Sequence, residues 1–336
     1  MSDREFEDCK QRRLIERQRY IQTVWLTLGL RHYLETRAKQ CRFVSAEPIF
    51  HTEQGSEIRP DVVLQYDSNS GALCEIKTSF PIPDSLLLET LKQLEKYGQP
   101  VIGWGTNDLT VQHHDVMLFC DILDINRILP KIREWLDNGQ LKIPENLVVC
   151  EWGIVQSPKI GDVILVRKRW GNARSEELNS LFNEDWVIDL RTLIIAYEKC
   201  RFTRKEPPVE YTMEQIWLYI FTKKTEKFEA FETSIEETLS IAYEYYLPWS
   251  NIRGEFSQVR ETWIKKAMKA FCSIELAKQV TDDQSKYKVF RDKEIDKDFL
   301  GYIIERLCRK REESKLKQAT EPDKEQRTMG DFQQLS

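Results

Sequence analysis

Residues 59–80 of the chain read RPDVVLQYDSNSGALCEIKTSF. Two runs rich in apolar residues, 61–66 and 72–79, each have the length of a β-strand, and the residues between them, Asp-Ser-Asn-Ser-Gly, are typical of a turn. The sequence therefore predicts a β-hairpin. This hairpin is the centre of the predicted fold, because the elements predicted on either side of it complete an α/β sandwich.

One long helix is predicted before the hairpin and a second helix after it. In residues 11–38, apolar side chains recur every three or four positions, and a second helix is expected from 84 or 85 to Tyr97. Further strands are predicted at 42–50, 101–105 and 116–121. The order of helix, three strands, helix and two strands indicates an α/β fold with a mixed sheet.

The hairpin carries three charged residues that are candidates for a functional site. Asp61 opens the first strand, and Glu75 and Lys77 lie two residues apart on the second, so these two share a face. Two carboxylates this close repel each other unless a cation lies between them. Mg²⁺ prefers oxygen ligands, so the predicted metal ligands are Asp61, Glu75 and the backbone carbonyl of Ile76, with Mn²⁺ as the alternative ion.

Such a site suits hydrolysis of a phosphodiester. A divalent cation acidifies a water molecule that can then attack phosphorus. Lys77 is a compact positive charge that can orient or help deprotonate the water, or neutralise charge that develops on the phosphate. These residues therefore predict a metal-dependent nuclease.

The spacing of these residues carries a resemblance to a known family. Pro60-Asp61, thirteen residues and then Glu75-Ile76-Lys77 resemble the signature of the PD-(D/E)XK nuclease superfamily, and Gln93 and Tyr97, one helical turn apart, resemble the QxxxY motif of its RecB-like branch. The resemblance covers about residues 11–121. It implies a restriction-endonuclease-like αβββαβ core, in which Gln93 and Tyr97 support the site or the substrate backbone.

Members of this superfamily often add an acidic residue from the first helix. The candidate here is Glu35, near the end of the predicted helix, and Glu16 and Glu47 remain open. RecB-like enzymes of the iron–sulfur type place cysteines around this core. The eight cysteines of this chain are scattered without a CxxC pair, so we expect small buried side chains and neither zinc nor an iron–sulfur cluster.

The middle of the chain is predicted to extend the nuclease domain. After a core at 1–125, an extension or connecting layer is expected at 126–200, with a helix at 122–140 and strands at 146–155 and 162–170. Whether these two strands join the first sheet stays open at this point. His113 and His114 are expected in a surface loop, because no carboxylate lies at ligand spacing.

A second domain is predicted at 209–311, after a linker at 201–208, and a disordered tail at 312–336. Helices expected at 213–222, 235–246 and 258–271, followed by two strands at 274–280 and 286–291 and a final helix at 298–311, have the order of a winged helix. Its third helix and hairpin supply the candidate nucleic-acid-binding residues. These are Arg260, Lys265, Lys266, Lys269, Lys286 and Lys288.

The composition limits the function classes. The chain has 336 residues, of which 41% are hydrophobic and 31% charged, so it can bury a core and remain soluble. Its net charge of −5 argues against coating nucleic acid through overall charge, although local basic strips still bind it. No stretch of 18 apolar residues and no signal peptide are present, so we expect a cytoplasmic location and no membrane.

The sequence therefore predicts a Mg²⁺-dependent deoxyribonuclease whose winged helix positions DNA or a protein partner. Because no ATPase motif is present, a motor or targeting factor would be such a partner. A non-catalytic DNA-binding or assembly protein on the same scaffold and a ribonuclease are the alternatives, and endonuclease or exonuclease action stays open.

Overall fold

The computed structural model describes a mixed α/β chain in two compact units. The described residues are 3–46, 48–67, 69–102, 113–143, 146–197, 202, 205–224, 229–244, 261–281, 283 and 285–320. The sheet unit comprises Arg19–Glu206 and Tyr243–Val259, and the helical unit comprises Met1–Gln18, Pro207–Ala242 and Arg260–Ser336. Helix α1 (Asp3–Arg37) contributes to both units. The sequence-based boundaries differ here, because they assigned the whole of 1–125 to one domain.

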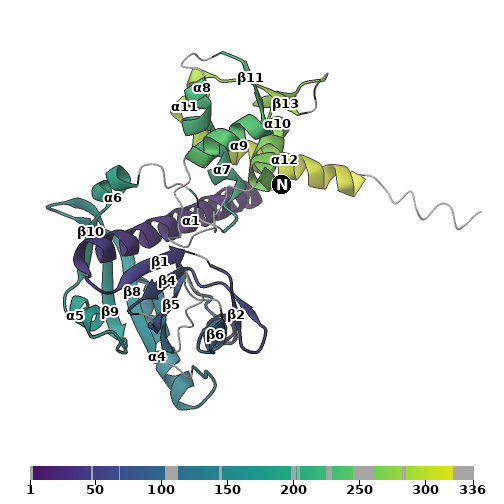
Figure 1. Cartoon of the computed structure of the whole chain (residues 1–336). Coiled ribbons are helices and arrows are strands. Elements are labelled where there is room, and N and C mark those ends of the chain that lie inside the picture. The colour runs from purple at the N-terminus through teal and green to yellow at the C-terminus, as the bar shows by residue number, and fades with distance from the viewer. Residues whose placement is uncertain are drawn as a thin grey trace, which may run out of the picture. The chain divides into compact units, whose positions relative to one another are not determined.

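A seven-stranded mixed sheet forms the centre of the sheet unit (Figure 1). In spatial order its strands are β1 (Arg42–Ala46), β4 (Val62–Gln65), β5 (Ser70–Lys77), β7 (His113–Asp121), β8 (Leu147–Ser157), β9 (Gly161–Trp170) and β10 (Trp186–Asp189). The predicted hairpin is formed by β4 and β5, which pair antiparallel, whereas β5, β7 and β8 run parallel. The strands expected at 146–155 and 162–170 are β8 and β9, and they extend this sheet.

Two helical layers cover the sheet. One face packs against α2 (Asp84–Leu91), α3 (Gln93–Tyr97) and α4 (Ile125–Asp137) through a core that includes Leu73, Leu118 and Ile128. The single helix expected to end at Tyr97 is thus divided at Lys92. The second half of α1 packs on the other face, where a Cβ at Gly29 would lie 3.2 Å from the Ile164 side chain (Figure 1). Glycine permits this close approach.

Shorter elements complete the sheet unit. The strand expected at 42–50 is two strands, β1 and β2 (Phe50–Thr52), and β2 pairs with β3 (Glu57–Ile58) and β6 (Val101–Ile102) in a second sheet. Helices α5 (Glu176–Leu181) and α6 (Leu190–Ala196), with β10 between them, were not predicted. They are too short to show a clear hydrophobic period.

The helical unit has three strands among its helices. In chain order its elements are α7 (Val209–Gln215), the π-helix η1 (Ile216–Ile220), α8 (Phe221–Lys224), β11 (Phe231–Ser234), α9 (Ile235–Glu244), α10 (Glu261–Ser273), β12 (Ala277–Gln279), β13 (Lys286–Val289), α11 (Lys293–Lys297) and α12 (Phe299–Thr320). The strand order is β11-β13-β12, and β11 was not predicted. Helix α12 continues past Arg311 to Thr320, and residues 321–336 of the expected tail lie outside the described residues.

The expectation that all cysteines are separate small side chains is wrong for two of them. Cys9 on α1 and Cys308 on α12 form a disulfide within the helical unit. Cys41, Cys74, Cys120 and Cys150 are free and buried, as expected. The bridge could not be predicted, because its partners are 299 residues apart and only the folded chain brings them together.

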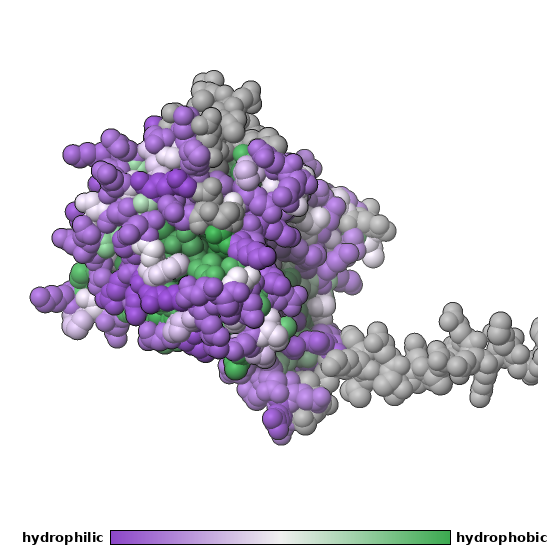
Figure 2. Space-filling view, turned by 90° about the horizontal axis from the view of Figure 1, so that it is seen from below, coloured by the Kyte–Doolittle hydropathy of each residue, from purple (hydrophilic) through white to green (hydrophobic). Residues whose placement is uncertain are grey.

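One face of the molecule is mostly polar. The face drawn in Figure 2 is dominated by hydrophilic residues, with hydrophobic residues gathered near its centre. Among the described helices, none is long and apolar enough to cross a membrane.

Candidate functional site

The β4–β5 hairpin brings the three predicted charged residues together. Val62 on β4 pairs with Cys74 on β5, so Asp61, the residue before β4, reaches the level of Glu75. The Asp61 Oδ2 atom accepts a hydrogen bond of 2.6 Å from the backbone N–H of Ile76. This contact holds the Asp61 carboxylate beside the strand that carries Glu75 and Lys77.

Glu75 is the most enclosed charge of the site, with 5% of its surface exposed. Burying a carboxylate costs free energy unless its oxygens are hydrogen-bonded or paired with a positive charge. Its Oε1 lies 2.7 Å from the Lys77 ammonium, and its Oε2 accepts a hydrogen bond of 2.8 Å from the Tyr97 hydroxyl. The Lys77 side chain is 20% exposed and connects the buried carboxylate to solvent.

Gln93 and Tyr97 of α3 close a ring of contacts around Glu75. The Lys77 Nζ donates to Gln93 Oε1 at 3.0 Å, and Gln93 Nε2 donates to the Tyr97 hydroxyl at 3.2 Å. The four-residue spacing of Gln93 and Tyr97 puts both on one helical face, which explains why they reach the same pair of charges. We call Asp61, Glu75, Lys77, Gln93 and Tyr97 the carboxylate cluster.

The Tyr97 hydroxyl acts as a hydrogen-bond donor in this cluster. Burial, and then the nearby Glu75 carboxylate, raise the pKa of Tyr97 far above its usual range, so the hydroxyl keeps its proton. It has one hydrogen and two acceptors within reach, Glu75 Oε2 and the backbone oxygen of Arg59 at 2.9 Å. Sequence reasoning missed Arg59, because a backbone contact leaves no signal in residue type.

The donor set of the cluster fits a divalent cation. Asp61, Glu75 and the Ile76 carbonyl offer only oxygen atoms, which Mg²⁺ and Mn²⁺ prefer. Each carboxylate oxygen can accept more than one contact, so the hydrogen bonds described above leave room for coordination at Glu75. Within the described ranges, no group of three or more His, Cys, Asp or Glu side chains is arranged to hold a metal, and a site with two carboxylates lies below that number.

The candidate from the first helix makes its contacts elsewhere. The Glu35 carboxylate accepts hydrogen bonds from Arg31 Nε at 2.8 Å and from the Tyr197 hydroxyl at 3.0 Å. Of the two alternatives, Glu16 is exposed and belongs to the helical unit, and Glu47 lies outside the described residues. These contacts give no support to a first-helix residue in the carboxylate cluster.

The prediction of two surface histidines is wrong for one of them. Both residues begin strand β7, where His113 is exposed but His114 is 2% exposed. The His114 Nε2 atom lies 2.5 Å from the backbone oxygen of Tyr97. His114 therefore fixes the end of α3 that carries Tyr97, and the apolar residues that follow it in β7 were the available signal.

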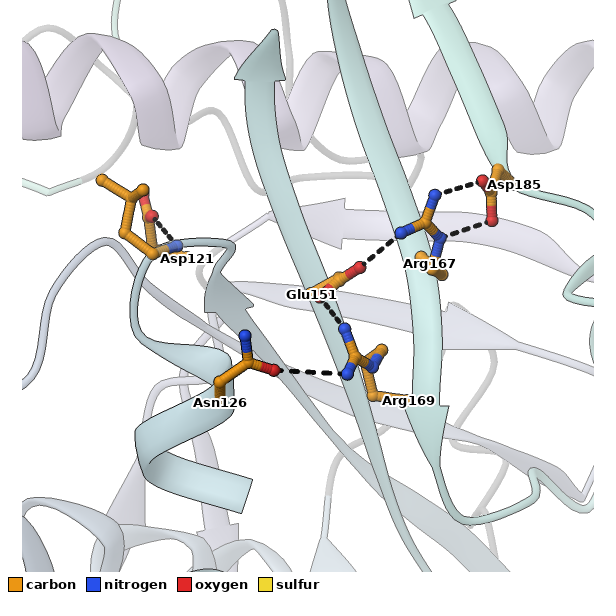
Figure 3. A network of polar contacts seen from close by, with 7 residues as sticks. Asp121, Asn126, Glu151, Arg167, Arg169 and Asp185 are labelled. Atoms are coloured by element: carbon orange, nitrogen blue, oxygen red, sulfur yellow. Dashed lines mark hydrogen bonds and ion pairs between the residues drawn. The ribbon is translucent and has the colours of Figure 1, made fainter. Parts of the chain in front are cut away.

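A second polar cluster lies on the same face of the sheet. The register aligns Lys77 on β5 with Cys120 on β7, then with Glu151 on β8 and Arg167 on β9. Glu151 is 1% exposed and accepts hydrogen bonds from Arg167 at 3.0 Å and Arg169 at 2.5 Å, one on each oxygen (Figure 3). Sequence reasoning missed this cluster, although one acidic residue within an apolar strand could have indicated it.

This second cluster is held in place from two sides. Arg167 donates to both oxygens of Asp185, and Arg169 donates to Asn126 near the start of α4 at 3.3 Å (Figure 3). The carboxylates of Glu151 and Asp185 balance the two guanidinium charges. The arrangement therefore joins β8, β9 and α4 without leaving an unbalanced charge.

The predicted nucleic-acid-binding residues lie in the helical unit. Lys265, Lys266 and Lys269 are exposed on α10, and Lys286 and Lys288 are exposed on β13, whereas Arg260 lies outside the described residues. Three of them, Lys265, Lys269 and Lys286, line a cavity of about 830 Å³. Two of these three have acidic neighbours, since Lys265 lies 2.5 Å from Glu261 and Lys286 lies 3.4 Å from Asp283.

Comparisons with known proteins add nothing to the geometry. No family model, no curated protein and no solved structure matches the chain. The residues of the carboxylate cluster and their chemistry are therefore the basis for a functional proposal.

Proposed function

We propose that the protein is a Mg²⁺-dependent deoxyribonuclease with its active site at the carboxylate cluster. The observation that carries this proposal is the Glu75 carboxylate held between Lys77 and Tyr97, at the level of Asp61 on the neighbouring strand. A partly exposed lysine beside a buried carboxylate and a second acid supplies both metal ligands and a positive charge, which metal-assisted phosphodiester hydrolysis can use.

Each residue has a role in this chemistry. Asp61, Glu75 and the Ile76 carbonyl would hold the cation, which supplies an acidified water molecule and neutralises phosphate charge when bound. The Lys77 ammonium orients the attacking water and stabilises the negative charge that develops on the phosphate oxygens. Gln93 and Tyr97 are positioning residues, because they hold Lys77 and Glu75 and need not touch the substrate.

The fold is consistent with this role. The order of α1, β1, β4, β5, the α2–α3 pair and β7 supports a restriction-endonuclease-like αβββαβ core with an accessory sheet. In the helical unit, a strand between the first two helices and a sheet order of β11-β13-β12 support a winged helix. We propose that its lysines on α10 and β13 contact DNA phosphates, and that the protein works on DNA inside the cell, with a motor or targeting partner where one is needed.

A cleavage assay tests the proposal. The purified chain is incubated with circular and linear duplex DNA, single-stranded DNA and RNA, in Mg²⁺, in Mn²⁺ and in EDTA. We expect cleavage of DNA in either metal and none in EDTA, and cutting of circles would identify endonuclease action. Glu75→Gln should abolish cleavage. Glu177→Gln should retain it, because the Glu177 carboxylate lies on α5 and accepts hydrogen bonds from the backbone N–H groups of residues 39–41, outside the cluster.

Two results would contradict the proposal. If RNA alone is cut, the enzyme is a ribonuclease that uses the same chemistry. If no substrate is cut and the wild type and Glu75→Gln bind DNA equally, the chain is a non-catalytic DNA-binding or assembly protein on this scaffold.

A further inference from the structure

Two apolar side chains project into solvent beside the carboxylate cluster. Ile82 is 83% exposed and Leu123 is 91% exposed. Ile82 follows β5, the strand that ends at Lys77, and Leu123 follows β7. Because β5 and β7 run parallel with Lys77 opposite Cys120, both loops leave the sheet at the edge where Lys77 lies.

Both residues lie close to the cluster along the chain. A fully extended chain spans at most about 3.6 Å per residue, so Ile82 lies within about 18 Å of Lys77 and Leu123 within about 11 Å of Cys120. A DNA strand rises about 3.4 Å per nucleotide along the helix axis. Both residues therefore lie no farther from Lys77 and its neighbour Cys120 than the length of a few base pairs of duplex DNA.

The two loops are braced against each other. The Asp124 carboxylate accepts a hydrogen bond from the Phe80 backbone N–H at 3.1 Å. Arg127 donates to the backbone oxygen of Pro81 at 3.0 Å and to Asp124 at 2.8 Å. Prolines on both sides of Ile82 further restrict its backbone. The exposed side chains are thus carried on a fixed support.

Ile82 and Leu123 are not needed to fill the hydrophobic core. In the same segment Phe80 is 7% exposed and Leu87 is fully buried, so the chain already supplies the core from neighbouring positions. Leu86, at the start of α2, is half exposed and adds to the apolar surface of this edge. Apolar side chains that gather at one edge of a protein surface are typical of an interaction site.

We infer that Ile82 and Leu123 form an apolar wedge that enters duplex DNA beside the scissile phosphate and separates neighbouring base pairs. The inference depends on the proposed nuclease function. Isoleucine and leucine wedges unstack a base step and kink the duplex without reading its sequence. The substrate class is therefore deformable duplex DNA, and cutting should favour mismatches and flexible pyrimidine–purine steps.

The test measures unstacking separately from cleavage. Duplexes that carry 2-aminopurine at successive positions are mixed with Lys77→Ala protein, in which cleavage is blocked. Fluorescence should rise as the base leaves the stack, and the rise should disappear when Ile82→Ser and Leu123→Ser are added. The matched control is Ile195→Ser on α6, whose side chain is 80% exposed in the same unit.

Cleavage by the otherwise wild-type chain gives the second readout. The double serine variant should cut fully paired duplex at least about tenfold more slowly, equivalent to about 1.4 kcal/mol, and a duplex with a mismatch at the same position at nearly the wild-type rate. The serine variants change only exposed side chains, so their thermal unfolding should match that of the protein without these substitutions. Equal loss on both duplexes, or no loss on either, would overturn the wedge.

The two proposals fail in different ways. If the wild type cuts no nucleic acid, the proposed function is wrong. If it cuts DNA but neither 2-aminopurine fluorescence nor the preference for mismatches depends on the wedge residues, only this inference is wrong. A change of oligomeric state in the double variant, with unchanged fluorescence, would assign the apolar edge to a protein interface and would also overturn the wedge.

Discussion

Removing the Tyr97 hydroxyl tests whether the ring of contacts around Glu75 serves catalysis. In Tyr97→Phe, Glu75 Oε2 loses a hydrogen bond of 2.8 Å and Gln93 Nε2 loses its acceptor. A hydrogen bond to a charged group contributes about 1.5–3 kcal/mol to stability, so we expect a loss of about 2 kcal/mol. For a unit of this size, that loss lowers Tm by about 4–8 °C.

The effect on activity should be larger than stability alone explains. With Oε2 released, the Glu75 carboxylate can rotate about its remaining contact with Lys77 and so misplace a metal ligand. Loss of a contact that orients a metal ligand typically lowers metal affinity or activity by about 10–100-fold. We expect a fall of that size in the cleavage rate at subsaturating Mg²⁺, with partial recovery at higher Mg²⁺.

Tyr66→Phe is the matched control. The Tyr66 hydroxyl donates to the buried Asp115 carboxylate at 2.9 Å in the same unit, away from the carboxylate cluster. Chemical denaturation and initial cleavage rates are measured for both variants. Both should lose similar stability, but Tyr66→Phe should cut normally at a temperature where it is folded. Equal cleavage by the two variants would refute the reasoning.

Three further predictions concern stability. Cys9→Ser should destabilise the helical unit by about 2–5 kcal/mol, the usual contribution of a disulfide. The wild type treated with dithiothreitol should unfold like the variant. An unchanged free energy of unfolding in both would contradict the bridge between Cys9 and Cys308. Glu151→Gln should lower the free energy of unfolding by about 1–3 kcal/mol, because two partly exposed arginines lose their buried carboxylate. Urea unfolding measures this loss, and an unchanged urea midpoint would show that the Glu151 charge does not stabilise the fold. Burial alone would raise the pKa of Glu177, but three backbone N–H donors lower it below its ordinary value of 4.5. Its charged form therefore stabilises the fold above that pH, and the advantage of wild type over Glu177→Gln should shrink as pH falls below it, whereas a constant difference in Tm would refute the assignment.

Much of the sheet unit could be predicted because its determinants are local. The turn residues at 67–71 and the apolar runs beside them predicted the β4–β5 hairpin, which the structure confirms. In the observed register of that hairpin, antiparallel pairing brings Asp61 to the level of Glu75, and helical spacing puts Gln93 and Tyr97 on one face. The members of the carboxylate cluster were therefore predictable from short segments.

Contacts between distant segments could not be predicted in the same way. Arg13 and Arg17 on α1 pair with Glu210 and Glu214 on α7, at a separation of 197 residues. Exposed helical residues of both signs are common, and sequence spacing does not say which of them meet. The Glu210 side chain is buried, at 1% exposed, and this burial raises the pKa of its carboxyl.

The initial rate of duplex DNA cleavage by Lys77→Ala, measured beside that of Lys168→Ala, tests whether Lys77 belongs to the active site. Lys168 lies on β9 and contacts Asn172, outside the carboxylate cluster. We expect Mg²⁺-dependent cleavage by the wild type and by Lys168→Ala. The rate for Lys77→Ala should be at least about 100-fold lower, as expected for loss of transition-state charge stabilisation. Equal rates for the two variants would contradict the claim that Lys77 and its carboxylate cluster form the active site.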